Sequence, residues 1–343
     1  MNPIDINTLV DDQGEVRFGR FADTLARING RQARYCTPMG EPASRWQQHF
    51  HYKQFQYFGI ISDELLVGCA LADTAWLGLA FAYVFNVRTG ELQEHTWRSP
   101  LARQLRMSES PVDGSSQFRN SAVEITLGYQ PDGDRRRKTL SLQCADLEIE
   151  ASLEESPAFQ PMSLCTRIGI NGWAYANKVA AVPVSGRVRT KNRQWDLAHL
   201  DACGHHDFSA GYMRRETFWN WACSSARVAG HRIGWNLSCG VNETSTTENC
   251  LWLDDQMIKV DLVHFEYDRR ALMNRWRIHS EDGAVELEFE PLGRHREHLN
   301  LKLFASNFNQ LFGRFRGQLK LPDGNCLQLD NVNGFVEEQY AKW

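Results

Sequence analysis

Titratable side chains are concentrated in one stretch of the sequence, residues 201–249. An imidazole beside a carboxylate can hold a proton near neutral pH, and a carboxyl group in an aromatic pocket can keep its proton. These residue types favour general acid/base chemistry. The candidates for proton transfer are Asp201, His205, His206 and Asp207. Later in the chain, Glu248, Glu337 and Glu338 are further carboxyl candidates.

Aromatic side chains in and before this stretch predict a pocket for an apolar or amphipathic molecule. In a strand, Trp219 and Trp221 lie on one face and Asn220 on the other. Aromatic walls bury a ligand, and a few polar groups orient it. The expected ligand-binding residues are Trp173, Tyr175, Asn177, Tyr212, Trp219, Asn220, Trp221 and Glu248. Alternatively, the same side chains form a hydrogen-bonded core cluster of a large β-protein.

Other reactive patterns in the sequence are incomplete. His49-x-His51, His205-His206-Asp207 and His295-x-x-His298 have spacings that metal sites use, but none comes with a complete ligand set. There is no G-x-S-x-G nucleophile motif, and none of the nine cysteines has a recognisable basic setting. We therefore expect no metal, no cofactor and no acyl-enzyme chemistry.

The hydrophobic pattern predicts an antiparallel, mostly β chain. Asp-Gly turns at 132–133, 282–283 and 323–324 each lie between segments in which apolar residues alternate with a period of two. The apolar runs 59–72 and 75–87 fit strands buried on both faces, although helices can also have such runs. Helical patterns are few and short, at 4–11, 19–28 and 307–311. No βαβ alternation or glycine-rich phosphate loop is present, which excludes nucleotide folds.

The strand-like segments outnumber the ~8 strands of one small barrel. The predicted fold class is therefore all-β, with two antiparallel barrels or strongly curved sheets packed side by side. The polar stretch 242–247 offers a division between them. The expected domains are 1–245, with an N-terminal extension, and 246–343.

Composition and charge limit the kinds of partner and the cellular location that we expect for this protein. The net charge of -4 and pI near 6.3 give no basic surface for nucleic acid. The one basic run, 135–138, follows the 131–134 turn and is interpreted as a solvated hairpin tip. No secretory signal or 18-residue apolar stretch is present, so we expect a cytoplasmic protein without stable membrane insertion. An odd number of cysteines without a C-x-x-C pair predicts free thiols.

The order of motifs resembles the bacterial family called domain of unknown function 2804. The motifs are Asn171 to Val188, Asp201-x-x-Gly204, Trp219 to Ala222, Thr247 to Asn249, Gln310-x-Phe312-Gly313-x-Phe315-x-Gly317 and Gly334 to Glu338 with Trp343. More distantly, this order is similar to AttH-like and carotenoid-hydratase-like proteins. The family's usual Gly-Arg-Gly after the Asp is Gly204-His205-His206 in this chain, so neither histidine inherits a family role.

That more distant resemblance implies two lipocalin-like β-barrels. It also implies cofactor-free hydration, isomerisation or cyclisation of isoprenoid or polyketide chains in a pocket between barrels, since some members of the group are such enzymes. The hypothesis is a binder of a hydrophobic or amphipathic small molecule (isoprenoid, lipid or polyketide-like), with acid/base chemistry on an alkene as its possible reaction. The alternatives are a non-catalytic lipid or pigment carrier and a structural or interaction protein with filled barrels. An inter-barrel cavity above ~300 Å³ with a carboxylate or imidazole on its wall would disfavour the last.

Overall fold

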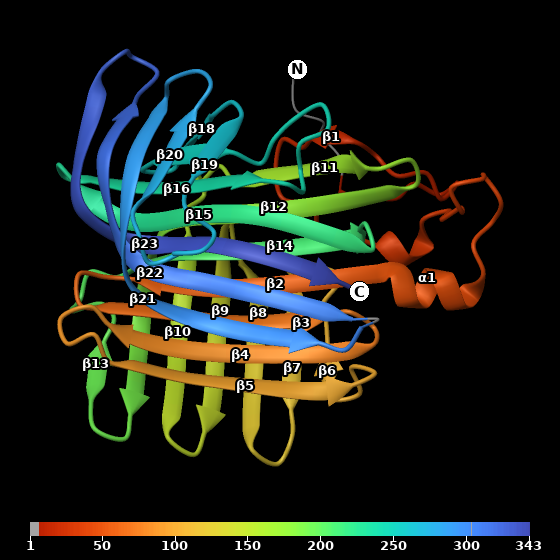
Figure 1. Ribbon diagram of the computed structural model, residues 1–343, viewed down its shortest axis with the longest axis horizontal. Helices are drawn as coiled ribbons and strands as arrows, with labels where there is room; N and C mark the ends of the chain where they lie inside the picture. The colour runs from red at the N-terminus through yellow and green to blue at the C-terminus, as the bar shows by residue number, and fades with distance from the viewer. Residues whose placement is uncertain (1–6, 303) are drawn as a thin grey trace.

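The computed structural model describes residues 7–302 and 304–343 (Figure 1). Strands hold 63% of the residues and helices 3%, and the strands form two large antiparallel sheets. The predicted all-β class, with lipocalin-like curved sheets side by side and few short helices, is confirmed.

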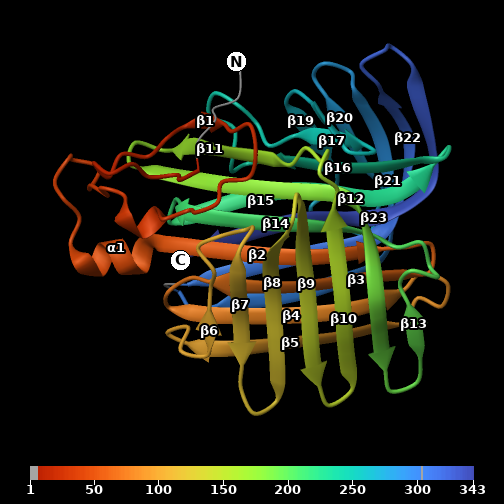
Figure 2. The ribbon, with the colours of Figure 1, turned by 180° about the vertical axis from the view of Figure 1, so that it is seen from behind.

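The first sheet comprises β1 (Gly19–Arg20), β2 (Tyr52–Ile61), β3 (Leu65–Asp73), β4 (Leu77–Asn86), β5 (Leu92–Pro100), β6 (Leu105–Arg106), β7 (Gly114–Arg119), β8 (Val123–Asp132), β9 (Arg135–Cys144), β10 (Leu147–Glu155), β11 (Met162–Ile168), β12 (Gly172–Thr190), β13 (Gln194–Asp196) and β14 (Cys203–Tyr212). Its main path runs β5-β4-β3-β2-β14-β12-β10-β9-β8-β7-β6. The register of β12 against β14 shifts between Val179 and Val182. The first half of β12 pairs with β11 and β14 and the second half with β10 and β13, so the sheet turns a corner there (Figure 2).

The second sheet comprises β15 (Glu216–Val228), β16 (His231–Cys239), β17 (Cys250–Leu253), β18 (Gln256–Lys259), β19 (Val263–Glu266), β20 (Trp276–Ser280), β21 (Val285–Asn300), β22 (Ala305–Lys320) and β23 (Cys326–Lys342). They lie in the order β18-β17-β16-β15-β23-β22-β21-β20-β19. The three predicted Asp-Gly turns join β8 to β9, β20 to β21 and β22 to β23, which confirms the hairpins.

The chain passes from the first sheet to the second between Tyr212 and Glu216. The predicted division at 245/246 assigns β15 and β16 to the first domain. In the structure β15 pairs with β16 on one side and with β23 on the other, so both strands belong to the second sheet. Strand pairing therefore favours a boundary at 213–215, although the division into domains stays a prediction.

Strands β2, β3 and β4 are buried on both faces. One face contributes Phe58, Val67 and other side chains to a core that also contains Ile125 and Leu142 of the opposite wall of the first sheet. The other face packs against aromatic side chains of the second sheet, including Phe312. Figure 1 shows β22 and β23 in front of β2 and β3. This double burial explains the apolar runs 59–72 and 75–87, because neither face of these strands meets water.

The described residues contain one α-helix, α1 (Arg45–His51), and one short 3-10 helix, η1 (Gly30–Gln32). A capping box between Ser44 and Gln47 starts α1. The helical turn expected near 307–311 is wrong because β22 covers those residues, and the described parts of 4–11 and 19–28 are not helical. Residues 4–6 lie outside the described residues. The His49-x-His51 pair would share one face of a strand, but both residues belong to α1, where residues two apart do not face the same side.

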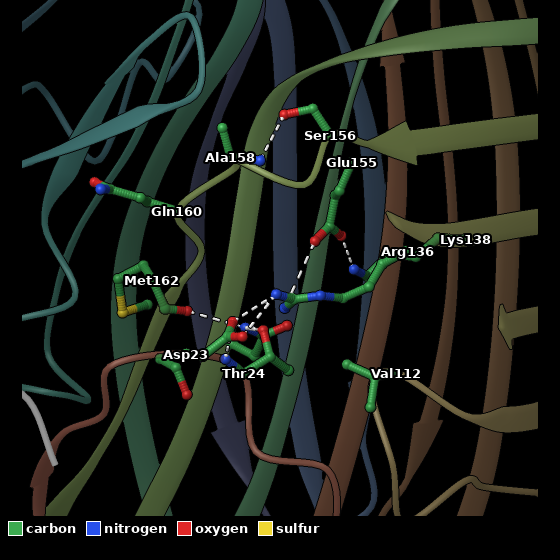
Figure 3. A network of polar contacts seen from close by, with 12 residues as sticks. Asp23, Thr24, Val112, Arg136, Lys138, Glu155, Ser156, Ala158, Gln160 and Met162 are labelled. Atoms are coloured by element: carbon green, nitrogen blue, oxygen red, sulfur yellow. Dashed lines mark hydrogen bonds and ion pairs between the residues drawn. The ribbon is translucent and has the colours of Figure 1, made fainter. Parts of the chain in front are cut away.

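The basic run 135–138 is not a solvated tip throughout. Figure 3 shows Arg136 pointing toward Asp23, and Arg136 Nη2 donates to Asp23 Oδ1 at 2.7 Å. Lys138 is buried and pairs with Glu155 of β10. Burial, together with the charge of Arg136, holds the pKa of Lys138 well below its usual range. The run lies in β9, where alternate side chains point inward. Lys138 is at one of the inward positions and is therefore buried.

Two other sequence predictions can be compared with the structure. All nine cysteines are free, as their odd number predicts. No helix among the described residues is long and apolar enough to cross a membrane.

Gly68 of β3 makes room for Tyr83 of β4. A Cβ at Gly68 would overlap the Tyr83 hydroxyl and ring, and Tyr83 is fully buried between the sheets. We expect Gly68→Ala to lower the free energy of unfolding by about 1–3 kcal/mol, measured by urea denaturation. In a Tyr83→Ala background the same substitution should cost little, because the clashing ring is gone. An equal cost in both backgrounds would contradict this packing.

Candidate functional site

A cavity of about 360 Å³ lies between the two sheets. The first sheet contributes wall residues from β2, β4, β12 and β14, and the second sheet from β15, β22 and β23. Much of the wall is apolar, as in Phe55, Leu79, Phe81 and Phe308. Five carboxyl side chains also reach the wall, among them Asp207, Glu248 and Glu337. The size suits a small organic molecule, and the wall offers both apolar surface and groups that titrate.

Glu337 of β23 is a buried acid with an unusual pKa. Burial raises its pKa to about 7; the hydrogen bond from Trp219 opposes that shift, and the charge of Asp207 adds to it. Trp219 Nε1 donates to Glu337 Oε2 at 3.1 Å, and Gln310 Nε2 donates to Glu337 Oε1 at 2.5 Å. A carboxyl group with this pKa is protonated in about half of the molecules at neutral pH. It can therefore give or take a proton under physiological conditions.

Gln310 links Glu337 to two buried tyrosines. The Tyr83 hydroxyl donates to Gln310 Oε1, and the Tyr57 and Tyr83 hydroxyl oxygens lie 2.6 Å apart. Tyr57 also lines the cavity. Burial raises the pKa of both hydroxyl groups well above 10, so they stay protonated. This chain of hydrogen bonds orients the Gln310 amide and so directs its NH₂ group at Glu337.

Lys178 of β12 lies between two other carboxylates of the wall. It pairs with Asp207 of β14, and its Nζ is 3.6 Å from Glu248 Oε1. Burial alone would lower the pKa of Lys178, but attraction to the two carboxylates outweighs burial and raises it. Burial raises the pKa of Asp207 despite Lys178. For Glu248 the opposite holds, because Lys178 and amide donors outweigh burial and lower the pKa.

The indole of Trp221 is anchored to Glu248 through one amide. Trp221 Nε1 donates to Asn236 Oδ1 at 2.7 Å, and Asn236 Nδ2 donates to Glu248 Oε1 at 3.4 Å. Asn242 Nδ2 donates to Glu248 Oε2 at 2.9 Å. Because amide donors meet both of its oxygens, Glu248 is held as a fixed anion. Trp219 and Trp221 both line the cavity, from the same face of β15.

The structure brings four of the predicted site residues to one cavity: Asp207, Trp219, Trp221 and Glu248. His205 lies nearby, between the sheets, with its Nε2 3.3 Å from Cys223 Sγ. Burial lowers the pKa of His205 to about 3, so the ring is neutral at physiological pH. His206 points to the opposite side of β14, where its Nε2 is 3.2 Å from the Tyr129 hydroxyl in the core of the first sheet. Consecutive strand residues face opposite sides, so the two imidazoles cannot act together.

The remaining predicted site residues lie away from the cavity. Asp201 is exposed in a turn and pairs with Arg227 at 2.6 Å. Asn177 Nδ2 donates to Thr24 Oγ1 at 2.9 Å, and Asn220 Nδ2 donates to the Tyr267 hydroxyl at 3.0 Å. Three aromatic residues belong to a separate buried cluster with the N-terminal segment: Trp173, Tyr175 and Tyr212. A direct role at this cavity is thus open only to the residues that reach it, and their roles remain predictions.

The histidine pairs with metal-like spacing have other contacts. His51 Nδ1 is 3.1 Å from the Tyr35 hydroxyl, and His295 Nδ1 is 2.5 Å from Glu94 Oε2. His298 is exposed and lies 3.3 Å from Asn307 Oδ1. These contacts separate each pair, because its members face different neighbours.

Sequence reasoning omitted Lys178 and Gln310 from the site and held Glu337 as one carboxyl candidate among several. Each of the three lies inside a segment that carries the family resemblance: 171–188, 310–317 and 334–338. A search for titratable residues inside those segments would have found Lys178 and Glu337. Gln310 gives no titration signal, and only its place between Tyr83 and Glu337 reveals its importance.

We expect Trp219→Ala to cost clearly less stability than Trp235→Ala. Trp235 is fully buried in the core of the second sheet, where truncation should cost about 3–5 kcal/mol. Trp219 is half-buried and borders existing empty space, so fewer packing contacts are lost. Urea denaturation of both variants gives the two free energies of unfolding. Equal losses would indicate that Trp219 packs like a core residue.

The raised pKa of Glu337 makes stability depend on pH. Because the folded state favours the protonated acid, its stabilising contribution is full below about pH 4.5 and is lost as the pH rises through about 7. The free energy of unfolding of the parent, relative to Glu337→Gln, should therefore fall by roughly 3 kcal/mol across this window. Denaturant unfolding at several pH values measures the difference. A difference that stays constant with pH would show that the pKa is not raised.

Comparisons with known proteins find distant similarities in structure. A crystal structure provisionally described as AttH (NE1406) from Nitrosomonas europaea has 12% sequence identity and a TM-score of 0.47, and the match covers 84% of this chain and 92% of that one. The crystal structure of kievitone hydratase from Nectria haematococca has 10% identity and a TM-score of 0.43, with 84% of this chain and 88% of that one covered. A search of curated proteins finds no match.

A family model gives the broader relationship. The model described as Domain of unknown function (DUF2804) matches residues 3–343. The match covers nearly the whole sequence and confirms the resemblance carried by the motifs from Asn171 to Trp343. The chain therefore belongs to the DUF2804 family.

Proposed function

We propose that the protein binds a hydrophobic or amphipathic small molecule in the cavity between its sheets and transfers a proton to a carbon–carbon double bond of that molecule. The observation that carries this proposal is a buried carboxyl group, Glu337, with a pKa of about 7 on the wall of a largely apolar cavity. A protonated acid on the wall of a largely apolar, aromatic pocket is suited to donate its proton to a weak base such as an alkene.

The proton transfer has a defined course. The Glu337 proton adds to one carbon of the double bond, which leaves a carboxylate on Glu337 and a positive charge on the other carbon. The aromatic faces of Trp219 and Trp221, which line the cavity, can stabilise that charge. The negative charge on Glu337 and the nearby charge of Asp207 favour the cation further.

The cation can be discharged in two ways. Water can add to it, in which case the proton released from the water passes to a carboxylate and the product is an alcohol. Alternatively, a proton leaves the adjacent carbon and the double bond shifts. Asp207, held by Lys178 on the cavity wall, is the second carboxylate in position to accept a proton. Return of that proton to Glu337 through solvent restores the starting state.

The test uses deuterium. Purified protein is incubated in D₂O with geraniol, farnesol or oleate as unsaturated probes, and products are analysed by mass spectrometry. Quenching of tryptophan fluorescence reports binding separately, because Trp219 and Trp221 border the cavity. We expect the parent protein to incorporate deuterium into at least one probe, and Glu337→Gln to bind that probe without incorporation. The rate should fall about tenfold per pH unit above about pH 7, because only protonated Glu337 donates.

The matched control is Glu338→Gln. Glu338 is adjacent in sequence and also buried, but its Oε2 accepts from the Tyr267 hydroxyl at 2.8 Å and from Arg269 Nε at 2.9 Å on the other side of β23. Glu338→Gln should therefore incorporate deuterium like the parent. Incorporation that survives in Glu337→Gln would remove Glu337 as the donor. Binding in every variant with no incorporation by the parent would instead support a non-catalytic carrier.

A further inference from the structure

A second group of reactive side chains lies in the first sheet, outside the cavity wall. His95 is on β5, Cys144 ends β9, and Asp146 is in the turn between β9 and β10. All three are partly buried, so a small ion can still reach them from solvent. Each offers one ligand atom, and these atoms lie within 4.8 Å of one another. In residues 7–302 and 304–343, no other group of three or more His, Cys, Asp or Glu side chains meets this condition.

Two of the three separations between these atoms match a tetrahedral metal site. His95 Nε2 is 3.1 Å from Asp146 Oδ1, and Cys144 Sγ is 3.6 Å from the same oxygen. Around a tetrahedral Zn²⁺ with ordinary bond lengths, a nitrogen and an oxygen ligand lie about 3.3 Å apart, and a sulfur and an oxygen ligand about 3.5 Å apart. Since the ligand atoms of His95 and Cys144 also lie within 4.8 Å of each other, the three side chains can converge on one ion.

Neighbouring residues hold the histidine ligand in position. The ring of His95 stacks on Trp97, with centroids 5.4 Å apart and an angle of 14° between the planes. Gln93 Nε2 lies 3.3 Å from His95 Nε2 and donates to the backbone oxygen of Asp146 at 3.0 Å. The same imidazole nitrogen thus faces an amide donor and a carboxylate acceptor, and it cannot satisfy both at once. A cation between His95, Cys144 and Asp146 would accept a lone pair from all three.

The position of the group in the fold suggests what an ion would do. Within the described part of the chain, strand β5 is an edge of the first sheet and pairs with β4 alone. The turn after β9 lies several strands away along the path of the sheet, and the curvature of the sheet brings it beside β5 (Figure 2). An ion bound there would tie the edge strand to the opposite wall and so close this end of the first sheet.

We propose that His95, Cys144 and Asp146 bind one Zn²⁺-class divalent cation, with water as the fourth ligand, and that the ion braces β5 against the turn between β9 and β10. The donor set determines the class of metal. Imidazole nitrogen and thiolate sulfur favour Zn²⁺ and Co²⁺, whereas Mg²⁺ and Ca²⁺ favour sites made of oxygen atoms. This site contrasts with the expectation from sequence that no metal is bound, which rested on histidine pairs without a complete ligand set and on the lack of a C-x-x-C pair.

The experiment uses Co²⁺ as a spectroscopic probe. Full-length protein is freed of metals by dialysis against a chelator and titrated with Co²⁺, which absorbs in the near ultraviolet when a thiolate is bound to it. We expect one equivalent of Co²⁺ per chain to produce this absorption, and Zn²⁺ to displace it. Zn²⁺ should also raise the melting temperature of the metal-free protein, whereas Mg²⁺ should not.

Three variants test the assignment. Cys144→Ser should abolish the thiolate absorption, and His95→Gln and Asp146→Asn should weaken Co²⁺ binding by about tenfold or more. Cys326→Ser is the matched control, because Cys326 is an exposed thiol on β23, outside the proposed ligand group. Circular dichroism confirms that each variant is folded before titration. The proposal is overturned if the parent gives no thiolate absorption, or if Cys144→Ser retains it. The proton-donor variant Glu337→Gln should bind Co²⁺ normally, which keeps this test separate from the proposed function.

Discussion

The packing of the second sheet on β2, β3 and β4 is the constraint on which the rest of the structure depends. These strands have an apolar core on one face and the aromatic residues of the second sheet on the other. The second sheet thereby removes water from a region that also contains Lys178, Asp207, Glu248 and Glu337. The contacts that stabilise the fold are therefore also the cause of the raised pKa of Glu337, because burial is the main contribution to that shift.

Glu248 and Glu337 differ in protonation state because their immediate partners differ. Glu248 receives amide donors and lies beside Lys178, which favours its ionised form. Glu337 is bound by an indole and an amide, and burial favours its protonated form. Two carboxyl groups on one wall thus differ in protonation at neutral pH. Such a division is what acid/base catalysis on a neutral molecule requires, since one group must give a proton while another carries charge.

The sequence allowed much of the fold to be predicted because its signals are local. Asp-Gly turns with alternating flanks identify hairpins, and continuous apolar runs identify strands without a wet face. The site was harder to predict than the fold, because it is built from residues far apart in the chain, such as Lys178 and Glu337. His205 and His206 were both predicted as site residues because they are adjacent in the sequence. In a strand, however, adjacent side chains lie on opposite faces. Asp201 could not be placed from sequence, because its exposure depends on the turn before β14 and its partner Arg227.

The cavity of this protein lies between its two sheets, not inside either of them. The interior of each sheet is filled by its own apolar core, and the empty space lies where the sheets meet. Strand β15 serves both regions, since Trp219 and Trp221 face the cavity while Asn220 bonds Tyr267 on the other side. A ligand in this space must contact both sheets at once. Its binding free energy is therefore coupled to the packing between the sheets. Any molecule bound there also stabilises the arrangement of the sheets in which Glu337 is buried.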